Sequence, residues 1–439
     1  MNRSTPEPLT FVPGSAAVGP DGAAPSSAVS LADTLLRTRD EVLADLELWH
    51  LGTSAPGGRP LAWAGCVDLP ERLLADYRLD RTRTDNRSEL GRVLAAARRL
   101  AEQVDRVVVL ASQRDQGGRI AVEACCHPQH DVLSRADRGG QPRVAFDGFD
   151  FDNDARASLL ELVGRTLPGG GVEERTGLVA IATEGWALET AVALRQFLAV
   201  IARLQSGRSE RLGSLVIPVV GGDAKLVELA RTLACPEVFR DDGGITGPFA
   251  VFTPAGLLPV ALAGLDIVGL LAGAEAMTAR FQDEPPGNNP VLDFVAQSRA
   301  LDTVGGRAVS TLTVAAHGLR SLAAWHAQLR ADSSADGAVR RVIETRLVVD
   351  HPRREPLVVG PSVFGPDGLE GIEGETLAHL AERSRLEQGV QRHDVGSEIH
   401  LPRLDPASVG QLLQMLLLAA AVDARWHNGV SAKPSGTGS

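Results

Sequence analysis

The sequence contains very little lysine and has an excess of acidic charge. Lys225 and Lys433 are its two lysines, so arginine supplies nearly all of the basic charge. Asp and Glu together number 55 against 44 for Lys and Arg, and the formal net charge is -11. Such a chain is poorly suited to the DNA backbone or to an anionic membrane. We therefore expect neither nucleic acid nor a membrane as a partner.

Cysteines and long apolar runs are also scarce, which excludes further classes. The four cysteines show no spacing typical of a disulfide framework or a zinc site. Leu412–Val422, the most apolar helix candidate, has about half the length that a membrane span needs. The Pro-, Ala-, Ser- and Gly-rich start of the chain lacks the apolar core of a signal peptide. We expect a cytoplasmic protein with no metal and no cofactor.

The sequence does contain a regular alternation of helix and strand patterns. Its 439 residues and 44% hydrophobic content suit two domains. Ser88 can cap a helix whose apolar residues follow helical spacing, and Arg106–Leu110 (RVVVL) has the fully apolar pattern of a buried parallel strand. The alternation restarts at Ser214–Val220, which predicts two α/β halves divided near residue 210.

The prediction for the whole chain follows from this pattern. We expect a flexible tail over residues 1–30, helices and a first α/β domain over 31–210, a second α/β domain with closing helices over 211–430, and a tail over 431–439. Other predicted strands are Arg143–Phe146, Leu178–Ala182, Glu237–Arg240, Ala308–Ala315, Val342–Val349 and Glu398–Leu401. Other predicted helices are Leu188–Leu204, Ala224–Leu233, Leu319–Arg330 and Pro406–Trp426.

Two local motifs suggest metal sites, and both have simpler interpretations. Asp150, Asp152 and Asp154 have the oxygen spacing of a calcium loop, but Ala155 stands where that loop needs glycine. A polar turn with Asp152 or Asn153 as helix cap is the favoured interpretation.

The second motif is a run of potential soft ligands, Cys125, Cys126, His127 and His130. No second cluster completes a four-ligand site, so a buried helix end is favoured. The glycine pairs along the chain are turn signals, and none belongs to a Walker loop or a dinucleotide fingerprint.

The segment from Gly243 to Pro259 resembles the second signature of glucose-6-phosphate isomerases, which reads Gly-Gly-Arg-Phe-Ser-Val and continues into a Gly-Leu-Leu-Pro helix. Asn289–Leu292 and Ser397–Ala421 also resemble family segments and follow in the family's order, so that the likeness covers roughly residues 60–430. The resemblance implies two SIS-type three-layer αβα domains, each with a mainly parallel sheet. It also implies a homodimer with the active site at the domain junction.

The likeness is weakest where the family binds phosphate. The family's Ser-Lys-Ser-Gly-Gly-Thr loop matches Ala182–Ala187 (ATEGWA), so Thr183 replaces the lysine and Glu184 places a carboxylate where phosphate binds. Two like charges about 4 Å apart repel by roughly 1 kcal/mol in water and by more in a cleft. Trp186 would also fill the space. The substrate-binding positions implied by this match are Thr183, Glu184, Gly185 and Ala187.

Other family positions are replaced as well. The family's first glycine-rich loop matches Ala111–Gln116, ahead of Gly117 and Gly118, and the arginine that stabilises the enediolate falls on Pro248. The resemblance places the catalytic base at Asp332, one methylene shorter than the family's glutamate.

Two further segments of the family have no counterpart. The segment with the ring-opening histidine is essentially absent, because residues 334–339 lead directly into the next strand. The C-terminal lysine is also missing, and Lys433 is the one residue that could stand in for it.

The resemblance implies conversion of glucose 6-phosphate to fructose 6-phosphate in glycolysis and gluconeogenesis. The replacements predict instead a catalytically impaired protein or pseudoenzyme that binds a sugar phosphate or a related small molecule. It would act as a binding or regulatory subunit, either as a homodimer or as the partner of an active paralogue. The alternative is an active aldose–ketose isomerase with Asp332 as base and Arg114 as a new anion anchor.

Overall fold

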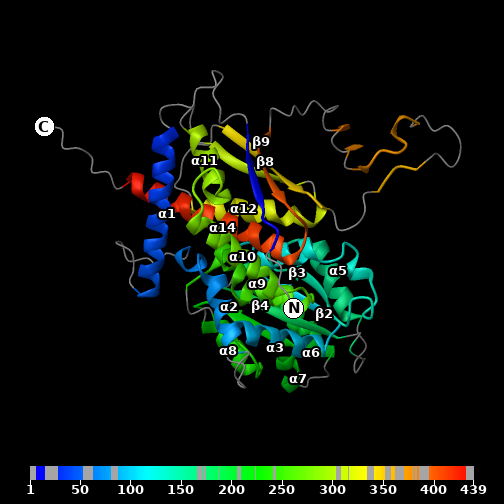
Figure 1. Ribbon diagram of the computed structural model, residues 1–439. Helices are drawn as coiled ribbons and strands as arrows, with labels where there is room; N and C mark the ends of the chain where they lie inside the picture. Colours follow the sequence, from blue (N-terminus) through cyan, green and yellow to red (C-terminus); the bar gives the residue numbers. More distant parts are fainter. Residues whose placement is uncertain are drawn as a thin grey trace.

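The structure is a computed structural model, and its element arrangement is shown in Figure 1. It describes residues 6–14, 28–52, 63–80, 88–165, 172, 175–185, 187–204, 209–222, 224–240, 244–302, 308–314, 316–333, 341–351, 357–360, 370–377, 379–380, 383–384 and 395–431.

The first sheet has five parallel strands in the order β3-β2-β4-β5-β6. Its central strands are apolar and buried on both faces, as the β4 sequence TGLVAIA predicts. The strands are β2 (Arg106–Leu110), β3 (Arg143–Asp147), β4 (Thr176–Ala182), β5 (Val216–Val220) and β6 (Phe239–Arg240). The predicted boundary near residue 210 is wrong, because β5 and β6 lie beyond it and continue this sheet.

The second sheet has four strands in the order β1-β9-β8-β7. Its strands are β1 (Thr10–Pro13), β7 (Ala308–Val314), β8 (Arg341–Val349) and β9 (Val395–Leu401). The last three are parallel, and β1 adds to β9 in the antiparallel direction. The described residues therefore confirm the predicted α/β class with two mainly parallel sheets.

The start of the chain is ordered over residues 6–14, which contradicts the predicted tail over 1–30. Leu9 is fully buried, and its N–H donates to Oε1 of Gln411 at 3.0 Å. The Leu9 carbonyl accepts from Nη1 of Arg280 at 2.7 Å, and the Glu7 carbonyl accepts from Gln411. The composition of this segment did not reveal that the apolar Leu9 is held by Gln411, 402 positions away, and by Arg280, 271 positions away. Residues 1–5 and 15–27 lie outside the described ranges, as does the tail predicted after residue 431.

Helices cover both faces of the first sheet. α5 and α6 pack side by side, while α3 and α4 pack against α9. The chain passes from β2 outward to β3 and then back across to β4, so right-handed crossovers place α4 and α5 on opposite faces. The helices of this half are α2 (Leu69–Asp80), α3 (Glu89–Ala101), α4 (Gly117–Cys125), α5 (Asn153–Gly164), α6 (Leu188–Leu204), α7 (Ser209–Ser214), α8 (Ala224–Thr232) and α9 (Pro254–Leu262). Ser88 caps α3 as predicted, accepting from the Gly91 N–H.

The remaining helices pack around α14 (Pro406–Ser431), which crosses the centre of the molecule (Figure 1). α14 contacts α10 over most of its length and also touches α11, α12 and α1. It is long and apolar enough to span a membrane, but 94% of its most apolar stretch is buried inside the protein, as in the core helix of a globular domain. These helices are α1 (Ala28–His50), α10 (Ile267–Asp283), α11 (Pro290–Asp302) and α12 (Arg320–Ser333), with short 3-10 turns at Ala64–Cys66, His130–Val132, Gly247–Phe252, His317–Leu319 and Glu370–Ile372.

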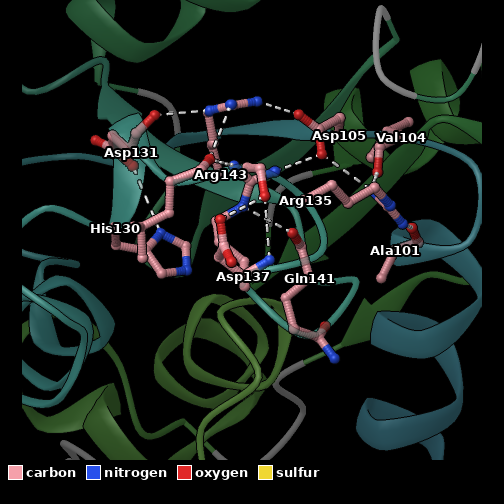
Figure 2. A network of polar contacts seen from close by, with 12 residues as sticks. Ala101, Val104, Asp105, His130, Asp131, Arg135, Asp137, Gln141 and Arg143 are labelled. Carbon is pink, nitrogen blue, oxygen red and sulfur yellow. Dashed lines mark hydrogen bonds and ion pairs between the residues drawn. The ribbon is translucent and has the colours of Figure 1, made fainter.

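A buried carboxylate organises the end of the first sheet opposite the strand C-termini. Asp105 precedes β2, and its side chain is 3% exposed. It accepts hydrogen bonds from Arg135, Arg138 and Arg143 (Figure 2). Arg135 also donates to the carbonyls of Val104 and Ala101 at the end of α3. Asp105 therefore joins the 133–143 segment to the start of β2, and Arg135 joins the same segment to the end of α3.

Candidate functional site

The loops that follow β2 and β4 meet at the carboxyl edge of the first sheet. Strand order reverses there, since the chain leaves β2 for β3 on one side and continues from β4 to β5 on the other. Ligand sites of open α/β sheets lie at such a switch point. The structure thus brings together two segments that the resemblance matched to separate family loops, Ala111–Gln116 and Thr183–Gly185.

Thr183, which the resemblance matched to the family's lysine, is held in the protein interior by hydrogen bonds. Its hydroxyl donates to Oδ1 of Asp115 at 2.5 Å and accepts from the Gly247 N–H at 2.9 Å. The second oxygen of Asp115 accepts from the Ser112 hydroxyl at 2.9 Å. Thr183 is 1% exposed and Asp115 is 7% exposed. The hydroxyl is therefore committed to two internal partners and does not point to solvent as a free donor.

Burial also affects the ionisation of Asp115 in this group of hydrogen bonds. It raises the pKa of the Asp115 carboxyl above its ordinary value, and the nearby Glu184 carboxylate acts in the same direction. The hydrogen bonds from Thr183 and Ser112 and the charge of Arg114 oppose the rise. A carboxyl group next to two hydroxyls and a second carboxylate is a poor surrounding for a phosphate dianion.

Glu184 forms an ion pair with Arg114 from the neighbouring loop. Nε of Arg114 lies 2.5 Å from Oε2 of Glu184, and Nη2 lies 3.1 Å from Oε1. Thr246 donates its hydroxyl to Oε1 at 3.2 Å. Both charged side chains are a little over a third exposed. The negative charge of Glu184 is thus paired, and Arg114 is not the open anion anchor of the alternative prediction, because the two side chains engage each other.

Gly247 closes the space beside this pair. Its φ of +57° lies in the left-handed region. A Cβ at this position would lie 2.8 Å from Oε1 of Glu184 and 3.3 Å from Nε of Arg114. Only glycine lets the backbone approach the pair this closely while its N–H reaches Thr183. The loops after β2, β4 and β6 are therefore joined at one point.

The two other glycine positions carried over from the family serve helix packing. A Cβ on Gly117 would lie 2.5 Å from Cγ2 of Val251, and one on Gly118 would lie 2.6 Å from the carbonyl oxygen of Gly256. Both glycines are buried at the start of α4. They allow α4 to approach α9 and the preceding turn, and they present no open backbone to a ligand at these contacts.

Pro248, which the resemblance matched to the family's arginine, lies within the buried Gly247–Phe252 turn. Its carbonyl accepts from Nε1 of Trp325 at 3.1 Å, which fixes α12 against this turn. Asp332 lies in the last turn of α12, on helical backbone that ends at Ser333. Gly185 and Ala187 are half-buried in the stretch between β4 and α6. The side chain of Asp332 and the residues Trp186, Ser334–Val339 and Lys433 lie outside the described part.

The calcium-like motif is a helix cap, and the Cys and His run is a helix end that is half-buried to exposed, not buried as predicted. Oδ1 of Asp152 accepts from the N–H groups of Asp154 and Ala155, each at 3.0 Å, so Asp152 is the cap of α5, as predicted. Cys125 ends α4, and Cys126 and His127 follow it. Within the described residues no three His, Cys, Asp or Glu side chains are grouped to hold a metal ion.

Sequence reasoning missed three participants: Asp115, Thr246 and Gly247. Asp115 has one local signal, the Ser112-x-x-Asp115 spacing, in which the serine hydroxyl meets the carboxylate. Thr246 and Gly247 are recognised only when the loop after β6 is seen beside β4. Most donors of this cluster form hydrogen bonds with the carboxylates of Asp115 and Glu184.

These features define a class: an α/β protein with two mainly parallel sheets and a polar cluster at the switch point of the first. No family model matches the chain. A hypothetical protein from Thermus thermophilus has the same fold at a TM-score of 0.70 and 19% identity, covering 95% of this chain and 94% of that one. A glucose-6-phosphate isomerase from Chlamydia trachomatis superposes at a TM-score of 0.61 and 16% identity, covering 92% and 83%.

The comparison of sequences identifies a narrower group of relatives than the comparison of folds does. Glucose-6-phosphate isomerase of Symbiobacterium thermophilum is 27% identical over 396 residues, which span 83% of this chain and 82% of that protein. The chain is therefore a distant relative of glucose-6-phosphate isomerases, as the signature around Gly247–Pro259 indicated.

Proposed function

We propose that this glucose-6-phosphate isomerase-like chain is a pseudoenzyme that has lost the phosphate site of its relatives. The Arg114–Glu184 ion pair is the main support for this proposal. It engages the arginine and places a carboxylate in the loop where the resemblance locates phosphate. A sugar phosphate would have to break that pair and lie beside Glu184. Repulsion between two unit charges about 4 Å apart amounts to roughly 1–4 kcal/mol for effective dielectric constants between water and a protein surface.

The other positions matched to functional groups of the family also support a loss of activity. An aldose–ketose isomerase needs a phosphate anchor, a base, an acid for ring opening and a group that stabilises the enediolate. Here a buried Thr183 replaces the anchoring lysine, and the Pro248 carbonyl is engaged by Trp325 where the family has arginine. Loss at several separate positions, with the core retained, indicates a scaffold kept for binding. We infer a cytoplasmic binding or regulatory subunit, either a homodimer or the partner of an active paralogue.

Two measurements on the purified full chain test the proposal. A coupled assay with fructose 6-phosphate should give no turnover above the uncatalysed rate, with the Symbiobacterium relative as positive control. Calorimetry with glucose 6-phosphate should show no saturable binding at millimolar concentration. Micromolar affinity for glucose 6-phosphate, or turnover comparable to that of the relative, would refute the pseudoenzyme.

A further inference from the structure

The two faces of the second sheet differ in burial. One face packs on α11, α12 and α14, and its side chains Leu347, Ile399 and Leu401 are buried. Side chains alternate between the faces of a strand, so the residues between these belong to the other face. Thr10 and Val12 of β1 are exposed on that second face, and the polar side chains of β8 and β9 on it are partly exposed. Solvent protons therefore reach this face, which we call the open face.

Four charged side chains form a row across β8 and β9 on the open face. Nε of Arg346 in β8 donates to Oε1 of Glu398 in β9 at 2.9 Å. Nε2 of His400 lies 3.1 Å from Oε2 of the same glutamate. Nδ1 of His400 lies 2.8 Å from Oδ1 of Asp350, the residue that follows β8. Positive and negative groups alternate along the whole row when the imidazole of His400 is protonated.

The geometry at His400 requires that proton. Both ring nitrogens lie within hydrogen-bond distance of a carboxylate oxygen. A neutral imidazole has one N–H donor and one bare nitrogen, whereas the protonated ring has two donors. Loss of the proton would turn the lone pair of the bare nitrogen toward a carboxylate. One of the two contacts must then open.

The surroundings of His400 place its titration above the usual range. Partial burial lowers its pKa, but the hydrogen bonds and charges of Asp350 and Glu398 outweigh burial and raise the pKa above its ordinary value of 6.5. From β1, Thr10 lies opposite His400 and Val12 opposite Glu398, and neither is charged. α14 contacts β9 from the buried face. The charged groups around the ring are therefore those of the row itself.

Asp350 is the partner that His400 should lose on deprotonation. Glu398 keeps Arg346 as a second partner, which holds it in place on β9. The Asp350 side chain is 38% exposed against 26% for Glu398, so water replaces the imidazole more readily at the aspartate.

Asp350 lies where the chain leaves the second sheet. Its N–H donates to the Leu401 carbonyl at 2.8 Å, and the N–H of His351 donates to the Pro402 carbonyl at 2.9 Å. These two bonds extend the pairing of β8 and β9 beyond the strands. The described parts of the stretch that follows, residues 357–384, lie away from both sheets (Figure 1). The contact between His400 and Asp350 therefore fixes the point from which this stretch departs.

We propose that His400 is a pH-sensitive latch, which holds the end of β8 against β9 when protonated and releases it when neutral. Because the pKa is raised in the folded state, the latch is fully formed below about pH 6.5 and is lost as pH rises through the higher folded-state pKa. The latch lies in the second sheet and does not depend on the loss of the phosphate site in the first.

Hydrogen exchange of the full chain, followed by mass spectrometry at about pH 6 and about pH 8.5, tests the latch. After correction for intrinsic exchange rates, the N–H groups of Asp350 and His351 should be about fivefold less protected at the higher pH, the size expected for a partly exposed ion pair. His400→Gln should remove this dependence, because glutamine has no proton to lose in that range. His351→Gln, at the exposed neighbouring histidine, is the matched control and should retain it.

A titration of the imidazole checks the same proposal independently. NMR spectra of protein with isotope-labelled histidine, with the signal assigned by its loss in His400→Gln, should give His400 a pKa above 6.5. Asp350→Asn should lower that pKa, because it removes one of the two carboxylates. The proposal is wrong if His400 titrates at or below 6.5, or if exchange at Asp350 and His351 does not depend on pH. It is also wrong if His351→Gln abolishes the dependence as His400→Gln does.

Discussion

Arg114 and Glu184 satisfy each other across the two loops that, in glucose-6-phosphate isomerases, would face the substrate. Two nitrogens of the arginine meet the two carboxylate oxygens at 2.5 and 3.1 Å. The carboxylate therefore occupies the position that an anionic ligand would take beside Arg114 and Thr246. A single substitution can test whether this carboxylate keeps anions out of the loop.

Glu184→Gln should open the loop to anions. The substitution removes the competing negative charge and releases Arg114, which favours a phosphate group by about 1–4 kcal/mol. Calorimetry should then detect glucose 6-phosphate or inorganic phosphate at concentrations where the wild type shows nothing. Glu161→Gln, which breaks an exposed pair with Arg165 at 2.6 Å, is the matched control. If Glu184→Gln binds no better than the control, the carboxylate is not what excludes phosphate.

The buried Asp115 should produce a specific pH dependence of stability. Because burial raises its pKa in the folded state, the unfolded carboxyl loses its proton first as pH rises. Wild-type stability should therefore fall relative to Asp115→Asn as pH rises from about 4 toward neutrality. Urea denaturation of both proteins at several pH values measures the difference. Asp40→Asn, on an exposed side chain of α1, should show no such trend, and a constant difference for Asp115→Asn would contradict the prediction.

The fold was largely predictable because its strands are short apolar runs between helix patterns. Arg106–Leu110 and Leu188–Leu204 agree with the structure to the residue. The division near residue 210 failed for a physical reason. A buried strand such as Val216–Val220 has the same apolar pattern in either sheet, and nothing local in its sequence states which strand it will pair with.

The contacts among the candidate site residues could not be predicted from the sequence. The resemblance identified Thr183 and Glu184 as the phosphate-loop positions, and the structure brings them to the switch point of the sheet. Their partners Asp115 and Thr246 come from other loops, and only the tertiary fold shows which loops meet. The sequence did not predict that Arg114 neutralises Glu184, because the charge of a residue does not show which residue it will pair with.

Removal of the Asp105 carboxylate should destabilise the protein strongly. Asp105→Ala would leave Arg135, Arg138 and Arg143 without their shared acceptor, and breaking a buried ion pair costs about 3–5 kcal/mol. Urea denaturation measures this loss. Asp137→Ala, which removes an exposed carboxylate bonded to Ser134 in the same segment, should cost less than about 1 kcal/mol. Equal effects of the two variants would show that the network contributes little.

The N-terminal strand should contribute to stability although it is only four residues long. Leu9, the residue before β1, is fully buried, so Leu9→Ala should cost about 2–5 kcal/mol in the free energy of unfolding while its backbone hydrogen bonds to Gln411 and Arg280 remain. Val12→Ala on the same segment is the control, since Val12 is 46% exposed and should cost much less. Thermal or urea denaturation distinguishes them. If Leu9→Ala unfolds like the control, the segment behaves as the flexible tail that the composition predicted.

The last prediction concerns Asp332, the position matched to the family's base. Asp332→Asn and Asp332→Glu should both resemble the wild type in the coupled assay with fructose 6-phosphate, without measurable turnover. Asp332 lies on helical backbone in the final turn of α12, and that helix is fixed elsewhere by the bond from Trp325 to Pro248. A carboxylate alone neither opens a pyranose ring nor holds its phosphate, and correct orientation of reactants accounts for roughly 7–11 kcal/mol of barrier reduction. Wild-type turnover that disappears in Asp332→Asn and rises in Asp332→Glu would instead establish an active isomerase with a shortened base.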